Sequence, residues 1–313
     1  MTENTSGWTQ KVRSGEVAGL RMSSSQAQGL GQPGDEGLEV LVIEREDMYA
    51  MISLQGAQLL SCRLAGEPDF FWISPKTRMQ PGVAIRGGVP ICSPWFGVNR
   101  HDPESTTKHG FLRLEAFQIV SIEAQNDALV VVLQHRYQAG EEDQRFPASV
   151  LSEVRFTFGA ACEIELQTKV SGAKVPFSCA FHSYYAVNDV RSVEITGLES
   201  YTYLDNTDDL SRHLETGAIA FPGEVDRVYL DVKGTQHIID RDRILSVDGN
   251  NAPTAIIWNP GAELGAAMVD VGTDNHAGFV CVERGAAFDN ELKLAPEDVF
   301  TCSVRFSQSQ RQK

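Results

Sequence analysis

Residues 154–168 read Val-Arg-Phe-Thr-Phe-Gly-Ala-Ala-Cys-Glu-Ile-Glu-Leu-Gln-Thr. Apolar and polar residues alternate on both sides of the small residues Gly159-Ala160-Ala161. Successive side chains of a strand point to opposite faces, so each half places its apolar residues on one face. The stretch therefore predicts an antiparallel hairpin with one face in a core.

Similar runs recur from Leu38 onward, rich in β-branched and aromatic residues and separated by turn residues. Long stretches of helical periodicity are few. We expect further strands at residues 40–43, 57–64, 117–122, 129–134, 177–187, 192–195, 227–230, 237–239, 255–258, 278–283 and 300–306. These are too many strands for one flat sheet, so the chain is predicted to be all-β, with large antiparallel sheets packed face to face.

No linker or internal repeat divides this pattern. Residues 1–37 are rich in Ser, Gln and Gly and lack the apolar core of a signal peptide, so we expect a flexible leader. Residues 38–307 are expected to form one domain, and residues 308–313 a frayed C-terminal tail.

The composition excludes some partners. A formal net charge of −15 argues against nucleic acid, whose phosphates an acidic surface repels. No apolar stretch approaches the roughly twenty residues of a membrane span. The six cysteines show no metal-binding or disulfide spacing, which favours buried reduced thiols in a cytoplasmic protein.

One segment is locally basic. Arg86 precedes Gly87-Gly88-Val89-Pro90, and Lys108 and Arg113 flank His109-Gly110-Phe111-Leu112. Glycines allow close backbone approach to a ligand, and arginine matches phosphate oxygens. Arg86 and Arg113 lie among apolar and glycine neighbours, so each needs an anionic partner, either a ligand phosphate or an internal salt bridge. Lys108 by itself is ordinary surface charge.

His182 and Glu283 are the candidates for proton transfer. His182 follows Phe177-Ser178-Cys179-Ala180-Phe181 in a strand-like run, where a structural histidine is the alternative to a catalytic one. Glu283 ends the apolar run Phe279-Val280-Cys281-Val282, where desolvation would make it a better base. The alternative for Glu283 is an ion pair with Arg284.

Three further residues suit sugar binding. His109 is a candidate hydrogen-bonding group or an exposed loop residue. Asp226 is a candidate for holding hydroxyl groups, a turn residue or a partner of Arg227. Trp258 would stack on a sugar ring or belong to the core.

The chain resembles the glucose-6-phosphate 1-epimerase (hexose-6-phosphate mutarotase) branch of the galactose mutarotase-like superfamily, from about Leu38 to Phe306. Four segments carry this resemblance in the family's order: Arg86-Gly87-Gly88-Val89-Pro90 with Pro94-Trp95-Phe96-Gly97, His109-Gly110-Phe111-Leu112-Arg113, Phe181-His182-Ser183-Tyr184-Tyr185, and Val280-Cys281-Val282-Glu283.

The resemblance implies a β-supersandwich with the sugar on a concave sheet face and no metal or organic cofactor. It implies that His182 is the general acid on the ring oxygen and Glu283 the base on the anomeric hydroxyl. His109 would bind near the ring oxygen and Asp226 would hold hydroxyls. Arg86 and Arg113 would lie beside the phosphate, with Lys108 as a possible helper.

The sequence thus predicts an isomerase that interconverts the α and β anomers of glucose 6-phosphate or a related aldohexose 6-phosphate. Its partner would be that small molecule, without nucleic acid or membrane, and the chain would act as a monomer. The alternatives are an aldose 1-epimerase for unphosphorylated sugars and a non-catalytic carbohydrate-binding protein. The mechanism requires His182 and Glu283 to face one cavity, with a sugar ring between them.

Overall fold

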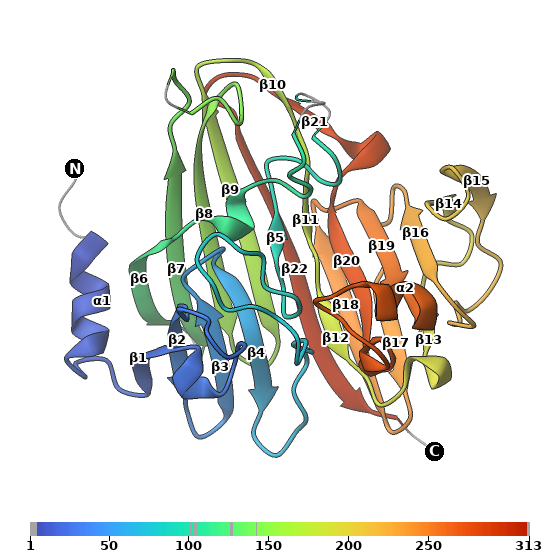
Figure 1. Cartoon of the computed structure of the whole chain (residues 1–313), viewed down its shortest axis with the longest axis horizontal. Helices are drawn as coiled ribbons and strands as arrows, with labels where there is room; N and C mark the ends of the chain where they lie inside the picture. Colours follow the sequence, from blue (N-terminus) through green and yellow to red (C-terminus); the bar gives the residue numbers. More distant parts are fainter. Residues whose placement is uncertain (1–4, 100–101, 103–104, 126–127, 142, 312–313) are drawn as a thin grey trace.

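The computed structural model describes residues 5–99, 102, 105–125, 128–141 and 143–311, and antiparallel sheets dominate it (Figure 1). The largest two contain eight strands each. The β22 sheet has the order β13 (Glu194–Thr196), β17 (Gln236–Asp240), β18 (Arg243–Asn250), β22 (Val299–Gln310), β9 (Cys162–Ser171), β8 (Ser149–Phe158), β7 (Ala128–Tyr137), β6 (Gln118–Gln125). The β20 sheet has the order β15 (Ser211–Leu214), β14 (Thr202–Asp205), β16 (Val225–Tyr229), β19 (Thr254–Asn259), β20 (Phe279–Ala286), β11 (Cys179–Phe181), β5 (Ile91–Cys92), with β12 (Tyr184–Ala186) also paired to β20.

Smaller elements complete the described chain. A four-stranded sheet has the order β1 (Leu20–Ser24), β2 (Glu39–Glu44), β3 (Met48–Ser53), β4 (Gln58–Leu64). A separate pair consists of β10 (Val175–Phe177) and β21 (Leu292–Leu294). The α-helices are α1 (Thr5–Arg13) and α2 (Gly261–Ala267). Short 3₁₀ helices lie at Gln26–Gln28, Leu112–Leu114, Val190–Ser192, Asn275–Gly278 and Phe288–Asn290.

The predicted hairpin at residues 154–168 is confirmed as β8 and β9. Val154 pairs with Leu166 and Phe156 with Ile164. All four side chains are buried, whereas their sequence neighbours are partly or fully exposed. The alternation of the sequence therefore becomes one core face and one outer face.

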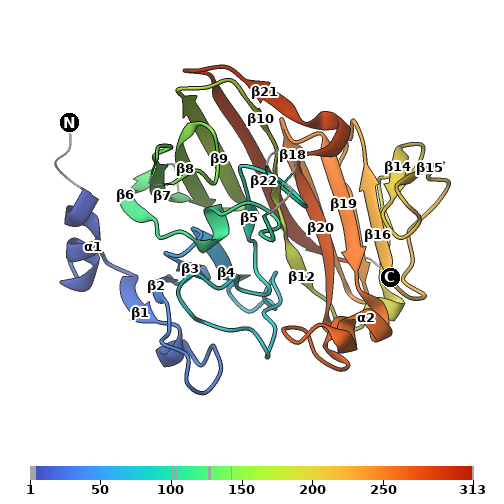
Figure 2. The same cartoon turned by 45° about the horizontal axis from the view of Figure 1, so that its top comes forward.

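Packing of the sheets against one another confirms the all-β prediction. β20 lies over β18 and β22, which joins the two eight-stranded sheets (Figure 2). One continuous core contains Val282 of β20, Val304 of β22 and Leu41 of the four-stranded sheet. The molecule is thus a sandwich of large antiparallel sheets.

β20 is buried on both of its faces. Val280 and Val282 point into the main core between the sheets. Phe279 and Cys281 belong to a separate apolar cluster on the opposite face. Because side chains alternate along a strand, Glu283 lies on the second face with Cys281.

The predicted leader is wrong for the part of it that the structure describes. Helix α1 packs on β6 and β1 at one edge of the molecule, and Leu20 of β1 pairs with Ile43 of β2 (Figure 1). Val12 and Leu20 are 2% and 7% exposed and belong to the main core. Val12 and Leu20, together with the partly buried Trp8, Val17 and Met22, dock a segment whose overall composition is polar.

The predicted frayed tail is wrong for residues 308–310. These residues extend β22, in which Gln310 pairs with Arg243 of β18. Backbone pairing needs no apolar composition, so a Gln- and Ser-rich stretch completes the strand. Residues 1–4, 312 and 313 lie outside the described residues.

The glycines after Arg86 contact the chain itself. Gly87 and Gly88 have φ values of 118° and 61°. A Cβ atom on Gly87 would lie 2.3 Å from the carbonyl oxygen of Trp72, and one on Gly88 would lie 2.3 Å from that of Leu59. Gly88 N also donates to the Trp72 carbonyl. The expectation that these glycines admit a ligand is wrong, because neighbouring backbone fills the space.

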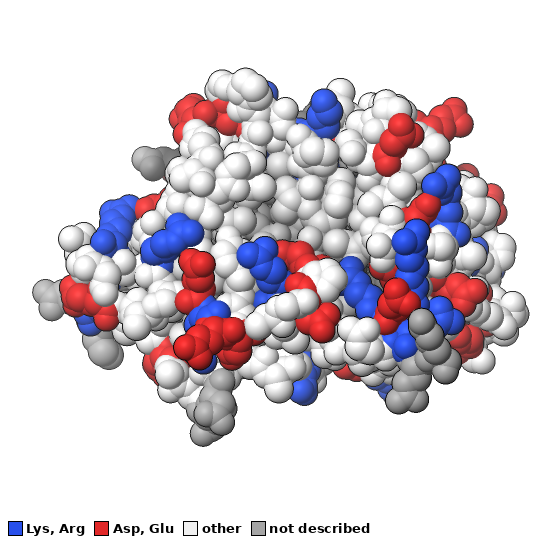
Figure 3. All heavy atoms as spheres, turned by 90° about the horizontal axis from the view of Figure 1, so that it is seen from below, with Lys and Arg blue, Asp and Glu red and all other residues white. Residues whose placement is uncertain are grey.

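Within the described ranges, no helix combines the length and apolarity needed to cross a membrane. Figure 3 shows Lys and Arg interspersed with Asp and Glu on the face seen from below. All six cysteines are buried and free.

We predict that Leu20→Ala lowers the free energy of unfolding by about 2–4 kcal/mol, the usual cost of truncating a buried leucine. Urea unfolding followed by circular dichroism measures this change. Arg21→Ala, on the same strand with an exposed side chain, is the control and is expected to cost less than about 0.5 kcal/mol. Equal and small effects of both substitutions would show that β1 contributes nothing to the core.

Candidate active site

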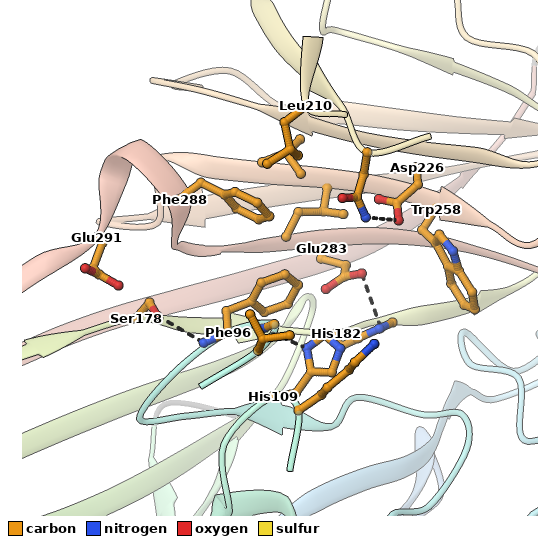
Figure 4. A pocket seen from close by; sticks show the side chains of 16 residues that line it. Phe96, His109, Ser178, His182, Leu210, Asp226, Trp258, Glu283, Phe288 and Glu291 are labelled. Carbon is orange, nitrogen blue, oxygen red and sulfur yellow. Dashed lines mark hydrogen bonds and ion pairs between the residues drawn. The ribbon is translucent and has the colours of Figure 1, made fainter. Parts of the chain in front are cut away.

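Glu283 and His182 meet in the β20 sheet. The pairing of Phe181 in β11 with Arg284 in β20 brings the residues beside them into register. His182 Nδ1 lies 3.3 Å from Glu283 Oε1 (Figure 4). The two residues are 8% and 1% exposed. Two strands that are about one hundred residues apart in sequence thus bring a buried imidazole and a buried carboxyl group into contact.

A cavity of about 390 Å³ lies over this contact. Val228, Ile256 and Glu283 occupy one cross-strand row of β16, β19 and β20 and share its floor. Asp226 and Trp258 form the next row on the same face. A volume of this size is typical of sites for small molecules.

The walls combine aromatic and polar groups. Phe96 and Phe288 line one side, with their ring centroids 5.9 Å apart. Lys108 and His109 approach from the loop after residue 104, and Glu291 lies at the far end (Figure 4). Apolar rings beside hydrogen-bonding groups suit a ligand with both CH surfaces and hydroxyl groups.

Backbone and ring contacts fix the orientation of His182. Its amide donates to the Pro90 carbonyl at 2.9 Å, and the Tyr184 amide donates to Gly88 at 2.9 Å. The Tyr184 ring stacks on the imidazole at 4.7 Å with an interplanar angle of 3°. Trp258 packs edge-on at 5.9 Å. The Gly-Gly-Val-Pro segment is therefore a backbone support for the histidine.

Burial shifts the pKa values of this pair in opposite directions. It raises the pKa of Glu283 well above 4.5, and the nearby charge of Asp226 acts in the same direction. It lowers the pKa of His182 well below 6.5, assisted by His109, Arg86 and Arg113. Both shifts favour the uncharged form of each group. A protonated carboxyl group beside a neutral imidazole gives the pair one transferable proton.

Two buried atoms of the pair have no hydrogen-bond partner. They are His182 Nδ1, whose contact with Glu283 lacks hydrogen-bond geometry, and Glu283 Oε2. Burying a polar atom without a partner is costly. Such atoms on a cavity floor are available to the hydroxyl groups of a ligand.

His109 contributes a neutral donor. Burial, then the charges of Arg113, Arg86 and Lys108, lower its pKa to about 3. Its Nδ1 accepts a long hydrogen bond of 3.4 Å from the Gly97 amide. The proton of the neutral ring therefore resides on Nε2, which can donate to a ligand.

Asp226 is neither a turn residue nor a partner of Arg227, the two alternatives that the sequence left open. Asp226 accepts a hydrogen bond from Asn206 at 2.7 Å, and burial raises the pKa of its carboxyl group. Arg227 instead pairs with Glu215 at 2.8 Å. Asp226 lies in strand β16, not in a turn.

Arg284 points away from Glu283, to the other side of β20. Its buried guanidinium donates to the carbonyl oxygens of Val232, Gly234 and Ala252. A Cβ on Gly249 of β18 would lie 2.6 Å from Arg284 Nε, so this glycine provides the necessary space. Alternation thus gives adjacent Glu and Arg residues opposite environments.

The basic residues occupy different positions. Lys108 lines the cavity, whereas Arg86 and Arg113 are not among its lining residues. Arg86 forms an ion pair with Asp270 at 2.7 Å and donates to the Tyr184 hydroxyl at 2.7 Å. Arg113 donates to the Lys108 carbonyl at 2.8 Å. For Arg86, the internal salt bridge is therefore formed, and a phosphate-binding role stays a prediction.

Sequence reasoning missed Asn206, Phe288 and Asp270. Asn206 lies in a polar turn before β16, where nothing in the sequence distinguishes it from ordinary turn residues. Phe288 has a φ of 55°, an unusual backbone value that sequence alone does not reveal. Asp270 is 184 residues from the arginine that it binds.

His182 and Glu283 also belong to a group of potential metal ligands. Within the described part of the chain, one group of three such residues was found, and it consists of His182, Cys281 and Glu283. Their nitrogen, sulfur and oxygen ligand atoms all lie within 4.8 Å of one another.

A buried acid–base pair under a cavity with polar and aromatic walls, in a sandwich of antiparallel sheets, defines an acid–base enzyme for small polyhydroxylated ligands. The aldose 1-epimerase family model matches residues 39–307. The chain belongs to the aldose 1-epimerase family and is therefore an isomerase.

Relatives and solved structures agree with this family. The chain is 34% identical over 258 residues to an Escherichia coli K12 protein named "Putative glucose-6-phosphate 1-epimerase", which covers 81% of this chain and 85% of that protein. A Cenchrus ciliaris protein of the same name is 31% identical, with 87% and 85% covered. A Salmonella typhimurium crystal structure named "a putative mutarotase" superposes with a TM-score of 0.80 at 30% identity, covering 90% of this chain and 92% of that chain.

We predict that Glu283→Gln stabilises the protein at neutral pH. Because the folded-state pKa of Glu283 is raised, its favourable contribution is present below the unfolded pKa and is lost as pH rises through the folded value. Thermal and urea unfolding should show a gain of about 1 kcal/mol at pH 8 that disappears near pH 4.

The matched control is Glu163→Gln, a partly exposed residue of β9, which should change stability equally and little at both pH values. Loss of stability in Glu283→Gln at pH 8 would contradict the account, because it would mean that the folded protein favours the ionised carboxylate.

Proposed function

We propose that this protein interconverts the α and β anomers of glucose 6-phosphate, or of a related aldohexose 6-phosphate, by opening and closing the sugar ring. The observation that carries the proposal is the 3.3 Å contact of His182 with Glu283 on a cavity floor. Support for the substrate comes from relatives that bear the name glucose-6-phosphate 1-epimerase.

Ring opening needs two proton transfers. In the free protein Glu283 holds the proton of the pair, and this proton passes to His182 across their contact before ring opening. Glu283 then takes the proton of the anomeric hydroxyl while His182 gives its proton to the ring oxygen, and the bond between that oxygen and the anomeric carbon breaks. The pair holds one proton before and after the step. After rotation of the aldehyde, the protonated Glu283 and neutral His182 reverse both transfers and close the ring on the other face.

The contact distance changes where the sugar lies. The sequence led us to expect a sugar ring between His182 and Glu283. This expectation is wrong, because a ring does not fit between two groups 3.3 Å apart. The ring oxygen and the anomeric hydroxyl oxygen are bonded to the same carbon, so two groups in contact can reach both from one side. We therefore place the sugar above the pair, in the cavity.

The walls supply the remaining contacts in this proposal. His109 donates through Nε2 near the ring oxygen, and Asp226 accepts from sugar hydroxyls beside Asn206. Lys108 reaches the phosphate from the cavity wall. Arg86 and Arg113 act from behind the wall, and Arg86 binds phosphate directly only by exchanging its Asp270 partner for it.

His182→Asn and Glu283→Gln are each predicted to reduce anomer exchange by about 10²–10⁴-fold, the usual contribution of a general acid or base. Exchange spectroscopy by NMR on an equilibrated mixture of α- and β-glucose 6-phosphate measures the rate above the spontaneous one. Glu163→Gln is the matched control and should retain the full rate.

A double variant distinguishes a binding protein from an enzyme. If His182→Asn/Glu283→Gln exchanges anomers as fast as the unmodified protein, the pair performs no chemistry and the proposal fails. If the unmodified protein binds the sugar without accelerating exchange, the protein is a non-catalytic carbohydrate-binding protein.

We predict that Lys108→Ala and Arg86→Ala each raise KM for glucose 6-phosphate by about ten-fold, the effect of losing one charge-assisted contact. KM for unphosphorylated glucose should change less than two-fold. Asp270→Asn removes the competing carboxylate and should lower KM for the phosphosugar only.

Equal effects on both sugars would assign the enzyme to unphosphorylated aldoses. An unchanged phosphosugar KM in Arg86→Ala, together with reduced stability, would leave Arg86 as a structural partner of Asp270 and assign phosphate recognition to Lys108.

We also propose that the protein works as a monomer in the cytoplasm. Six buried free thiols suit a reducing compartment.

A further inference from the structure

Cys281 lies beneath the acid–base pair. It is two residues before Glu283 on β20, and residues at this spacing share one face of a strand. It is fully buried, and its thiol is not used by the chemistry proposed above. The thiol sulfur, the imidazole nitrogen of His182 and the carboxylate oxygen of Glu283 lie within 4.8 Å of one another.

This combination of side chains is a zinc ligand set. Zn–S, Zn–N and Zn–O bonds are about 2.3, 2.0 and 2.1 Å long, so tetrahedral ligands lie roughly 3.3–3.7 Å apart. The longest distance between the three ligand atoms must therefore shorten by about 1 Å for them to bind one ion. The fourth position would face the cavity, where water or a substrate hydroxyl can reach it.

We propose that His182, Cys281 and Glu283 form a binding site for Zn²⁺ and similar thiophilic divalent cations, and that the bound ion blocks the acid–base pair. Two observations beyond the clustering support the site. His182 Nδ1 and Glu283 Oε2 are buried without hydrogen-bond partners, and a cation would satisfy both. Thiolate and carboxylate together also balance the two positive charges, so the buried complex carries no net charge.

Binding releases protons. The Cys281 thiol and the protonated carboxyl group of Glu283 each lose one proton as the sulfur–metal and oxygen–metal bonds form, and His182 uses a lone pair without releasing one. Occupancy therefore increases with pH. The ion engages both groups that transfer protons, so it competes with the sugar. This inhibitory consequence rests on the proposed function, whereas metal binding does not.

Cobalt titration tests the site directly. Co²⁺ added to the metal-free protein is expected to give one equivalent of four-coordinate cobalt with a thiolate-to-metal charge-transfer band, and Zn²⁺ should abolish the band by displacement. Cys281→Ser should remove the charge-transfer band and weaken binding at least ten-fold. Cys92→Ser, an equally buried thiol on β5, is the matched control and should retain both.

The unmodified protein provides a readout that does not depend on the folding of a variant. Zinc X-ray absorption should show one sulfur neighbour at about 2.3 Å together with nitrogen and oxygen neighbours. Absence of sulfur from the coordination shell, or a charge-transfer band that persists in Cys281→Ser, would overturn the proposal.

Activity separates this inference from the proposed function. A charge-transfer band in a protein without anomer exchange supports the metal site and contradicts the function. Exchange that is insensitive to Zn²⁺, with no cobalt band, overturns the metal site and leaves the function intact. Zinc inhibition of the unmodified enzyme that is at least ten-fold weaker in Cys281→Ser supports both.

Discussion

The carboxyl group of Glu283 is held out of water against the imidazole of His182, and much of the surrounding structure serves to maintain that contact. Removing a carboxylate from water is expensive, so the group stays protonated to a higher pH than usual. Removing the His182 imidazole from water lowers its pKa, so this ring stays neutral to a lower pH than usual. A pair that holds one transferable proton is what a reversible ring-opening reaction needs.

The architecture supplies this environment through the two faces of β20. One face packs Val280 and Val282 into the core, and the other carries Glu283 to the cavity floor, with Cys281 buried on the same face. The Gly87-Gly88 segment holds the backbone around His182 from the other side. Binding groups for a ligand lie on the loops and strands around this rigid centre, as is common in enzymes. The buried Cys281 thiol on that face is the sulfur ligand of the metal site proposed above.

The alternation of apolar and polar residues was enough to predict the β8–β9 hairpin and the all-β class, because every second residue of a half-buried strand is apolar. The contact of His182 with Glu283 depends on the pairing of β11 with β20, which local sequence does not specify. Pairing of Arg86 with Asp270 likewise depends on segments far apart in the chain. Docking of residues 5–37 escaped prediction because the apolar residues that pack on the core, among them Val12 and Leu20, are spread through a polar stretch. The prediction that another group packs closely against Gly87 and Gly88 is confirmed, but that group is neighbouring backbone and not a ligand.

The most direct test of the central claim is the protonation state of the pair in the folded protein. Nitrogen-15 NMR of His182 and carbon-13 NMR of the Glu283 carboxyl group, measured at about pH 5.5, distinguish the buried pair from ordinary side chains, which at this pH are an imidazolium and a carboxylate. The account predicts a neutral imidazole and a protonated carboxyl group. An imidazolium beside an ionised carboxylate would contradict it.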